Sequence, residues 1–178
     1  VVYNFGLINK VYIPKYIFPL SKCLFVGINF LLTLIPWFLI IILSQFGLGT
    51  HPASINWLYI LLPLILATMF IFTVGIGLFL SCVSVFLRDV FYIYGIVLTI
   101  WQYFTPIFYS IEIIPTKLQF LFQFNPLYQY INAVRDIVLY GNCPTATNLL
   151  LCLAYAVIAL VIGSVVFKKN QDKYIYYI

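Results

Sequence analysis

The sequence has very few charged residues for its length. Only 7% of its 178 residues are Asp, Glu, Lys or Arg, whereas 65% are hydrophobic. Soluble domains are about 25% charged and about 45–50% apolar, so this composition excludes a water-soluble globular protein. The chain is therefore expected to lie in a membrane, where a span has to satisfy its own backbone hydrogen bonds as a helix.

Residues suited to catalysis or metal binding are also scarce. The chain has four acidic residues and one histidine, His51, and its four cysteines form no CxxC pair. Those cysteines are expected to be small packing residues. There is no P-loop, HExxH, GxSxG or Rossmann fingerprint. We therefore expect no catalytic residue, metal or cofactor in this chain.

Long apolar runs predict an all-α integral membrane protein, a helical bundle with about four spans. A charge-free run of 22 residues is about 33 Å long as a helix, enough to cross about 30 Å of hydrocarbon. The expected spans cover residues 23–44, 57–86, 90–104 with an extension to about residue 111, and 149–167. In the second span Thr73, Gly77 and Ser81 recur every four residues, and this spacing predicts close helix packing.

The segment from Thr105 to Gly141 lies between expected spans but is interrupted by Pro106, Pro115 and Pro126. Its last part predicts an amphipathic helix with Asn125 as the cap, Pro126 in the first turn and Gly141 just past the end. At about 22 Å this helix is too short to cross. We expect it to lie at or within one membrane face, while a plain interfacial helix that only sets topology remains the alternative.

The distribution of Lys and Arg predicts the orientation of the chain. If the N-terminal lysines lie in the cytoplasm, successive spans alternate in direction, and Arg88 and the C-terminal lysines also lie in the cytoplasm. The resulting cytoplasmic set is Lys10, Lys15, Lys22, Arg88, Lys168, Lys169 and Lys173. Lys117 and Arg135 fall on the extracytoplasmic side. Topology therefore explains the net charge of +5, and no nucleic-acid partner is expected.

Several motifs follow one another in a distinctive order. These are LINKVYIPKYIFPL, FLRDV, TPIFYS and FNPLYQYINAVRDIVLYG, followed by a last span with a short basic tail. This order resembles the permease subunit of type-2 ATP-binding-cassette (ABC) exporters, and most closely the branch that exports polysaccharides such as O-antigen, capsule or teichoic acid. Members of that family have six spans, so residues 1–178 are expected to be one permease domain that lacks its N-terminal third.

The resemblance implies a cytoplasmic coupling segment in residues 1–20, which docks on a separate nucleotide-binding subunit. That partner would bind ATP and Mg, and hydrolyse the ATP. The matching residues are Lys10, Val11, Tyr12, Ile13, Pro14 and Lys15, together with Arg88 and Asp89 in a second cytoplasmic turn. A second copy of the chain would complete a homodimeric channel in the membrane lipid of the bacterial cytoplasmic (inner) membrane, as a multi-pass protein.

The resemblance also implies that residues 105–141 form an extracytoplasmic gate of re-entrant helices. Aromatic rings along the path are expected to stack on the sugars of a lipid-linked glycan, although an interfacial aromatic belt is the alternative. The channel and gate residues are Trp101, Tyr103, Phe104, Pro106, Phe108, Tyr109, Asn125, Pro126 and Arg135. Other readings stay open: a type-2 permease for drugs or other lipids, a membrane enzyme acting on lipid-linked sugars, and a structural subunit without a transport path.

Overall fold

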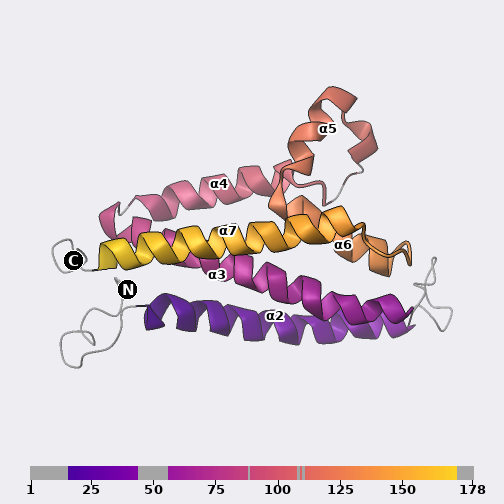
Figure 1. The fold of residues 1–178 in the computed structure, drawn as a ribbon, viewed down its shortest axis with the longest axis horizontal. Coiled ribbons are helices and arrows are strands. Elements are labelled where there is room, and N and C mark those ends of the chain that lie inside the picture. The colour runs from indigo at the N-terminus through magenta and orange to yellow at the C-terminus, as the bar shows by residue number, and fades with distance from the viewer. Residues whose placement is uncertain (1–15, 44–55, 88, 108, 110, 172–178) are drawn as a thin grey trace.

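A computed structural model describes residues 16–43, 56–87, 89–107, 109 and 111–171 (Figure 1). Within these ranges every regular element is a helix, and the predicted all-α architecture is confirmed. The elements are α2 (Ile17–Leu43), the 3-10 helix η3 (Trp57–Leu61), α3 (Leu62–Phe86), α4 (Val90–Phe104), the 3-10 helix η4 (Ile111–Ile113), α5 (Thr116–Gln123), α6 (Pro126–Val138) and α7 (Ala146–Asn170).

Three of the described helices are long and apolar enough to cross a membrane: α2, the continuous η3–α3 unit, and α7. The expected third span does not continue toward residue 111, because α4 ends at Phe104 after 15 residues. Thr105 leaves the helical conformation, with φ −102° and ψ 119°. It precedes Pro106, and a proline disfavours the helical region for the residue before it. At about 22 Å, α4 alone is shorter than a full span.

The helices α3 and α7 form the most extensive helix pair of the bundle (Figure 1). They cross at two glycines. A Cβ atom built on Gly163 would overlap the backbone carbonyl of Gly75, and one built on Gly75 would overlap the backbone of Ala159 and Leu160. The two backbones are therefore in direct contact, which is possible only because neither glycine carries a side chain.

The small residues singled out in the sequence lie elsewhere on α3. Thr73 is exposed, while Gly77 faces the Sγ atom of Cys23 on α2 rather than α7. Ser81 is half-buried, and its backbone carbonyl accepts a hydrogen bond from the hydroxyl of Ser84 at 3.0 Å. A shared helix-packing role for these three residues stays a prediction.

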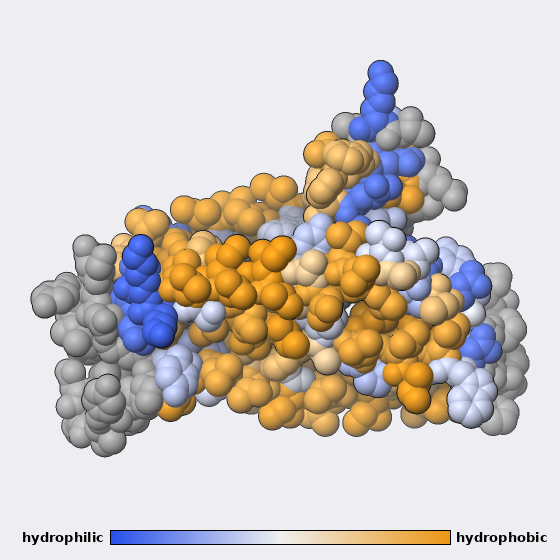
Figure 2. All heavy atoms as spheres, viewed as in Figure 1, coloured by the Kyte–Doolittle hydropathy of each residue, from blue (hydrophilic) through white to orange (hydrophobic). Residues whose placement is uncertain are grey.

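The two ends of the bundle differ in composition. The start of α2, with Lys22, and the end of α7, with Lys168 and Lys169, lie at the end where the termini are marked (Figure 1). Figure 2 shows an apolar surface between this end and the opposite one, where α5 projects and hydrophilic side chains gather again. The bundle thus has the apolar flank and polar ends of a membrane protein, and its described C-terminal lysines share one end, as the predicted orientation requires.

The glycine crossing predicts a large stability difference between two otherwise identical substitutions. Gly163→Ala forces the α3 and α7 backbones apart and should lower the free energy of unfolding by about 1–3 kcal/mol. Gly95→Ala on α4 is the matched control, since a Cβ atom there meets nothing within 4 Å, and it should leave stability unchanged or raise it by under about 1 kcal/mol. Thermal unfolding of the purified full-length protein in detergent measures both, and equal melting temperatures would contradict the direct backbone contact.

Candidate functional site

A buried amide joins the end of α4 to the start of α6. The Oδ1 atom of Asn125 accepts hydrogen bonds from Trp101 Nε1 at 2.9 Å and from the Leu127 backbone N–H at 3.1 Å. Its Nδ2 atom donates to Thr105 Oγ1 at 2.9 Å and to the Phe104 carbonyl at 3.4 Å. An amide side chain offers two lone pairs and two N–H groups, so all four are used. Asn125 therefore fixes the angle at which α6 leaves α4.

Two prolines shape this junction. Thr105, which is 1% exposed, ends α4 before Pro106 and donates its hydroxyl to the Trp101 carbonyl at 2.9 Å. Pro126 occupies the first turn of α6, where its missing N–H has no helical partner to lose. The predicted cap at Asn125 is confirmed by its bond to Leu127. Thr105 was missed from the sequence, although a hydroxyl four residues after Trp101 and directly before a proline is a usable signal.

The chain between α4 and η4 is held by two further side chains. Arg135 of α6 donates from Nη2 to the Ile107 carbonyl at 2.7 Å. Tyr109 donates from its hydroxyl to the Tyr103 carbonyl at 2.8 Å. The Arg135 bond ends on the non-helical segment that contains Pro106, and the Tyr109 bond ends on the last turn of α4. The structure thus ties this segment to α6 through Arg135 and back to the end of α4 through Tyr109.

An open groove of about 450 Å³ runs along this junction. Its wall is apolar apart from the Asn125 amide and the Trp101 indole N–H. Phe104, on its rim, stacks on Phe122 of α5 with 4.6 Å between ring centroids. The lining residues are Val97, Ile100, Trp101, Phe104, Leu121, Phe124, Asn125 and Pro126. Such a surface can hold apolar or ring-shaped groups, and its lining provides no nucleophile or acid–base pair.

The predicted channel and gate residues therefore divide into groups. Trp101, Phe104, Asn125 and Pro126 share the groove. Tyr103 is not among the lining residues, and the residue is 76% exposed. Asp89 lies at the first turn of α4, at the opposite end of that helix. Pro106 and Tyr109 lie in the segment after α4, which Arg135 contacts from α6, as described above. The other predicted residues lie outside the described part of the chain: Phe108, Arg88, and the coupling residues Lys10, Val11, Tyr12, Ile13, Pro14 and Lys15.

The buried face of α6 includes a polar residue. Gln129 is buried and donates from Nε2 to the Gln123 carbonyl. Tyr130, Ala133 and Ile137 are the most deeply buried residues of the helix. The hydroxyl of Tyr130 donates to the Cys152 carbonyl on α7 at 2.7 Å. The helix is rotated toward its small residue Ala133 because it packs on α3 and α7 together, and hydropathy alone does not report that contact.

Burial raises the pKa of the Asp136 carboxyl on α6 above its usual value. Within the part of the chain that the structure describes, no three His, Cys, Asp or Glu side chains lie close enough together to hold a metal ion.

Helices of spanning length, joined to short helices at one end, define a multi-pass helical membrane protein. Residues 7–139 match the family model for ABC-2 type transporters. The chain therefore belongs to the ABC-2 type transporter family, and this membership together with its apolar helices supports a multi-pass place in the cytoplasmic (inner) membrane.

Curated relatives agree with this family. The chain is 31% identical over 171 residues to an O-antigen export system permease protein RfbA of Klebsiella pneumoniae, with 96% of this chain and 63% of the relative covered. A second Klebsiella pneumoniae protein of that name is 33% identical over 138 residues, with 78% and 51% covered. One from Myxococcus xanthus is 25% identical over 170 residues, with 94% and 63% covered. The chain spans less than two thirds of the length of these relatives.

The Asn125 network predicts a loss of stability that depends on Trp101. Asn125→Ala removes a helix cap and leaves buried polar groups without partners, so the free energy of unfolding should fall by about 2–4 kcal/mol. Asn132→Ala, on the half-exposed side of the same helix, is the matched control and should change it by less than about 1 kcal/mol.

A double-mutant cycle with Trp101→Phe isolates the indole bond within that loss. We expect a coupling energy of at least about 0.5 kcal/mol between positions 101 and 125, because the two side chains share a hydrogen bond. Chemical denaturation of the full-length protein measures all four variants. Strictly additive losses would show that the indole–amide bond does not stabilise the junction.

Proposed function

We propose that this chain is the membrane-spanning subunit of an ABC exporter that moves a lipid-linked polysaccharide of the O-antigen type across the cytoplasmic membrane. Membership of the ABC-2 family and the printed names of the relatives support this proposal. The structural observation that carries it is the hydrogen bond between Trp101 and Asn125, which builds an aromatic-walled groove at the end opposite the basic tail. Rings of this kind can contact the apolar faces of sugars while a glycan slides past.

In this proposal two copies of the chain form the channel, and two copies of a cytoplasmic subunit bind and hydrolyse ATP with Mg. The coupling segment Lys10–Lys15 and the Arg88–Asp89 turn receive the motion of those subunits. The α3–α7 pair, whose backbones touch at Gly75 and Gly163, carries it as a rigid unit. The junction at Asn125 then moves α4 and α6 together, and the non-helical segment after Pro106 lines the opening, where water can satisfy its backbone.

The rival functions fit the site less well. A permease for drugs or other lipids shares the mechanism but gives no reason for stacked aromatic rings beside an amide. An enzyme acting on lipid-linked sugars needs a carboxylate or histidine near its substrate, and the groove lining has neither. A structural subunit predicts a dry interface between copies, so labelling of single cysteines along residues 90–109 with an aqueous reagent would separate it from a channel.

The decisive experiment is co-purification of the full-length protein with the cytoplasmic ATPase encoded beside it. We expect a stable complex whose ATPase activity rises severalfold when a lipid-linked glycan is added to the reconstituted membrane, because cargo binding and ATP hydrolysis are coupled in an exporter. An unrelated detergent-solubilised membrane protein with the same tag is the control for non-specific binding. Absence of any complex would remove the energy source and overturn the proposal.

A pair of tyrosines on α4 tests the sugar path. Tyr103 and Tyr92 are 76% and 79% exposed, but they lie near opposite ends of the helix. Tyr103→Ala removes a ring at the proposed exit but retains the backbone carbonyl that accepts from Tyr109. It should slow export of long glycans severalfold, because each lost stacking contact weakens sugar binding by about 0.5–1.5 kcal/mol. Tyr92→Ala should leave export unchanged. The rate at which glycan appears at the cell surface measures both variants. Equal effects would mean that Tyr103 belongs to an interfacial aromatic belt and not to the sugar path.

A further inference from the structure

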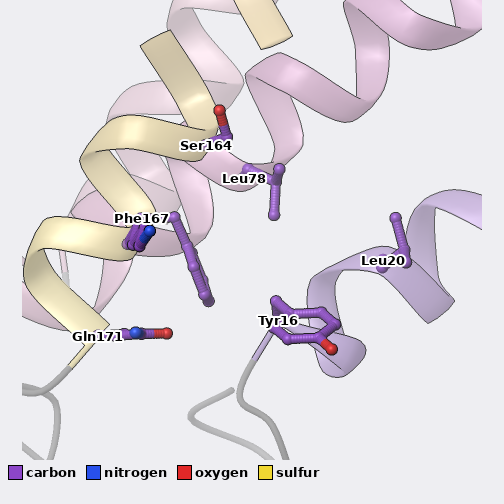
Figure 3. Close-up of a pocket in the computed structure, with 7 residues that line it drawn as sticks. Tyr16, Leu20, Leu78, Ser164, Phe167 and Gln171 are labelled. Atoms are coloured by element: carbon purple, nitrogen blue, oxygen red, sulfur yellow. The ribbon is translucent and has the colours of Figure 1, made fainter. Parts of the chain in front are cut away.

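A second groove lies at the basic end of the bundle, opposite the Asn125 junction. It has a volume of about 380 Å³ and lies between the start of α2, the middle of α3 and the last turns of α7 (Figure 3). Tyr16 and Phe167 approach the gap from opposite sides, and Leu78 points into it from α3 (Figure 3). The lining residues are Tyr16, Leu20, Leu78, Ser164, Phe167, Lys168 and Gln171.

The floor of this groove is apolar and firmly held. Leu20 and Leu78 form part of it, and Phe167 is 4% exposed because it packs with Cys82 and Val85. The apolar outer faces of α2 and α7 continue from the groove along the bundle, where Leu24 and Val165 are among many exposed apolar side chains. A hydrocarbon chain that starts on this floor can therefore pass directly into the bilayer.

The rim of the groove is cationic. Lys168 is the charged residue in the lining, and no described lining residue is acidic. Ser164 and Tyr16 also line the groove, and the hydroxyl of Ser164 donates to the Val161 carbonyl at 3.1 Å. Lys22 and Lys169 are exposed at the same end. An apolar floor below a positive rim is complementary to an amphiphile with an acidic head, and the long carbon stem of Lys168 allows its ammonium group to reach the headgroup level.

We propose that this groove binds an anionic glycerophospholipid of the cytoplasmic leaflet, with its phosphate on Lys168 and an acyl chain on Leu20, Leu78 and Phe167. The positive charge of the rim favours an anionic lipid as the occupant, since anionic lipids are concentrated where basic juxtamembrane residues lie. The volume accommodates a small headgroup and the first carbons of a chain, whereas a polysaccharide would have to remain outside. The proposal goes beyond the export function and does not depend on which cargo is moved.

Such a lipid would have a structural effect. The helices α2 and α7 each pack on α3 rather than extensively on one another, and the groove is the space that this arrangement leaves between them at the basic end. A bound lipid contacts both helices at once and therefore stabilises their relative position. Phosphatidylglycerol should raise the melting temperature of the purified protein more than phosphatidylcholine of the same chain lengths does.

The test is native mass spectrometry of the full-length protein in detergent with added phosphatidylglycerol or phosphatidylcholine. Lys168→Gln should reduce retention of phosphatidylglycerol about fivefold, which corresponds to about 1 kcal/mol for one lysine near an anionic headgroup. Lys169→Gln is the matched control, because it removes the same charge from the next residue, which does not line the groove. It should change phosphatidylglycerol retention by less than about twofold. Leu78→Trp, which fills the floor, should reduce binding of both lipids.

Three results would overturn the proposal. Equal losses in the two lysine variants would mean that diffuse positive charge, not the groove, attracts the lipid. Equal retention of the two lipids by the unmodified protein would remove the headgroup preference. Displacement of phosphatidylglycerol by an equal concentration of a polyprenyl-linked sugar lipid would assign the groove to the cargo. If Leu78→Trp does not fold, the comparison of the two lysine variants still decides.

Discussion

The contact between Gly75 and Gly163 is the constraint on which the rest of the bundle depends. Lipid gives apolar helices no hydrophobic reason to associate, so their packing relies on close van der Waals contact. The two glycines allow α3 and α7 to touch along their backbones. This pair then forms the platform for α6, which adds the hydrogen bond from Tyr130 to the Cys152 carbonyl. The helix α2 packs on the same platform through α3.

The helix α4 is attached by a different kind of interaction. Its surface is largely exposed from Tyr92 to Ile100, and it makes few contacts with α3. Its firm connection to α6 is the polar network at Asn125, where every hydrogen-bonding group of the amide is used. Hydrogen bonds of this kind are strong in a low-dielectric environment and depend on geometry. The fold therefore combines a rigid apolar frame with an arm that is fixed at one polar junction.

Local chemistry made part of this structure predictable. The long helices follow from hydropathy, and the start of α6 follows from the Asn125–Pro126 pair, because caps depend on neighbouring residues only. Gly141, just past α6, has φ 63°, as its position predicted. The partners of Trp101 and Gly163 were not predictable, because they are set by how distant helices meet. On α3 the sequence offered small residues at both 75 and 77, and only the tertiary structure shows that Gly75 meets α7.

The two ends of the molecule differ in their interactions, with exposed lysines at one end and hydrogen bonds to backbone carbonyls at the other. This difference bears on how a transporter subunit can work. At the basic end, Lys22 of α2 and Lys168 and Lys169 of α7 are exposed, so their interactions are screened by salt. At the opposite end, Arg135 and Tyr109 are hydrogen-bonded to carbonyls of the chain itself at short distances, and no counter-ion is needed for that geometry. In the proposed exporter, a displacement that begins at the basic end would reach the Asn125 junction through the α3–α7 pair, whose backbones touch. The segment after Pro106 lacks the helical hydrogen bonds that resist bending elsewhere, so it is the place where we propose that such a displacement becomes a change of shape.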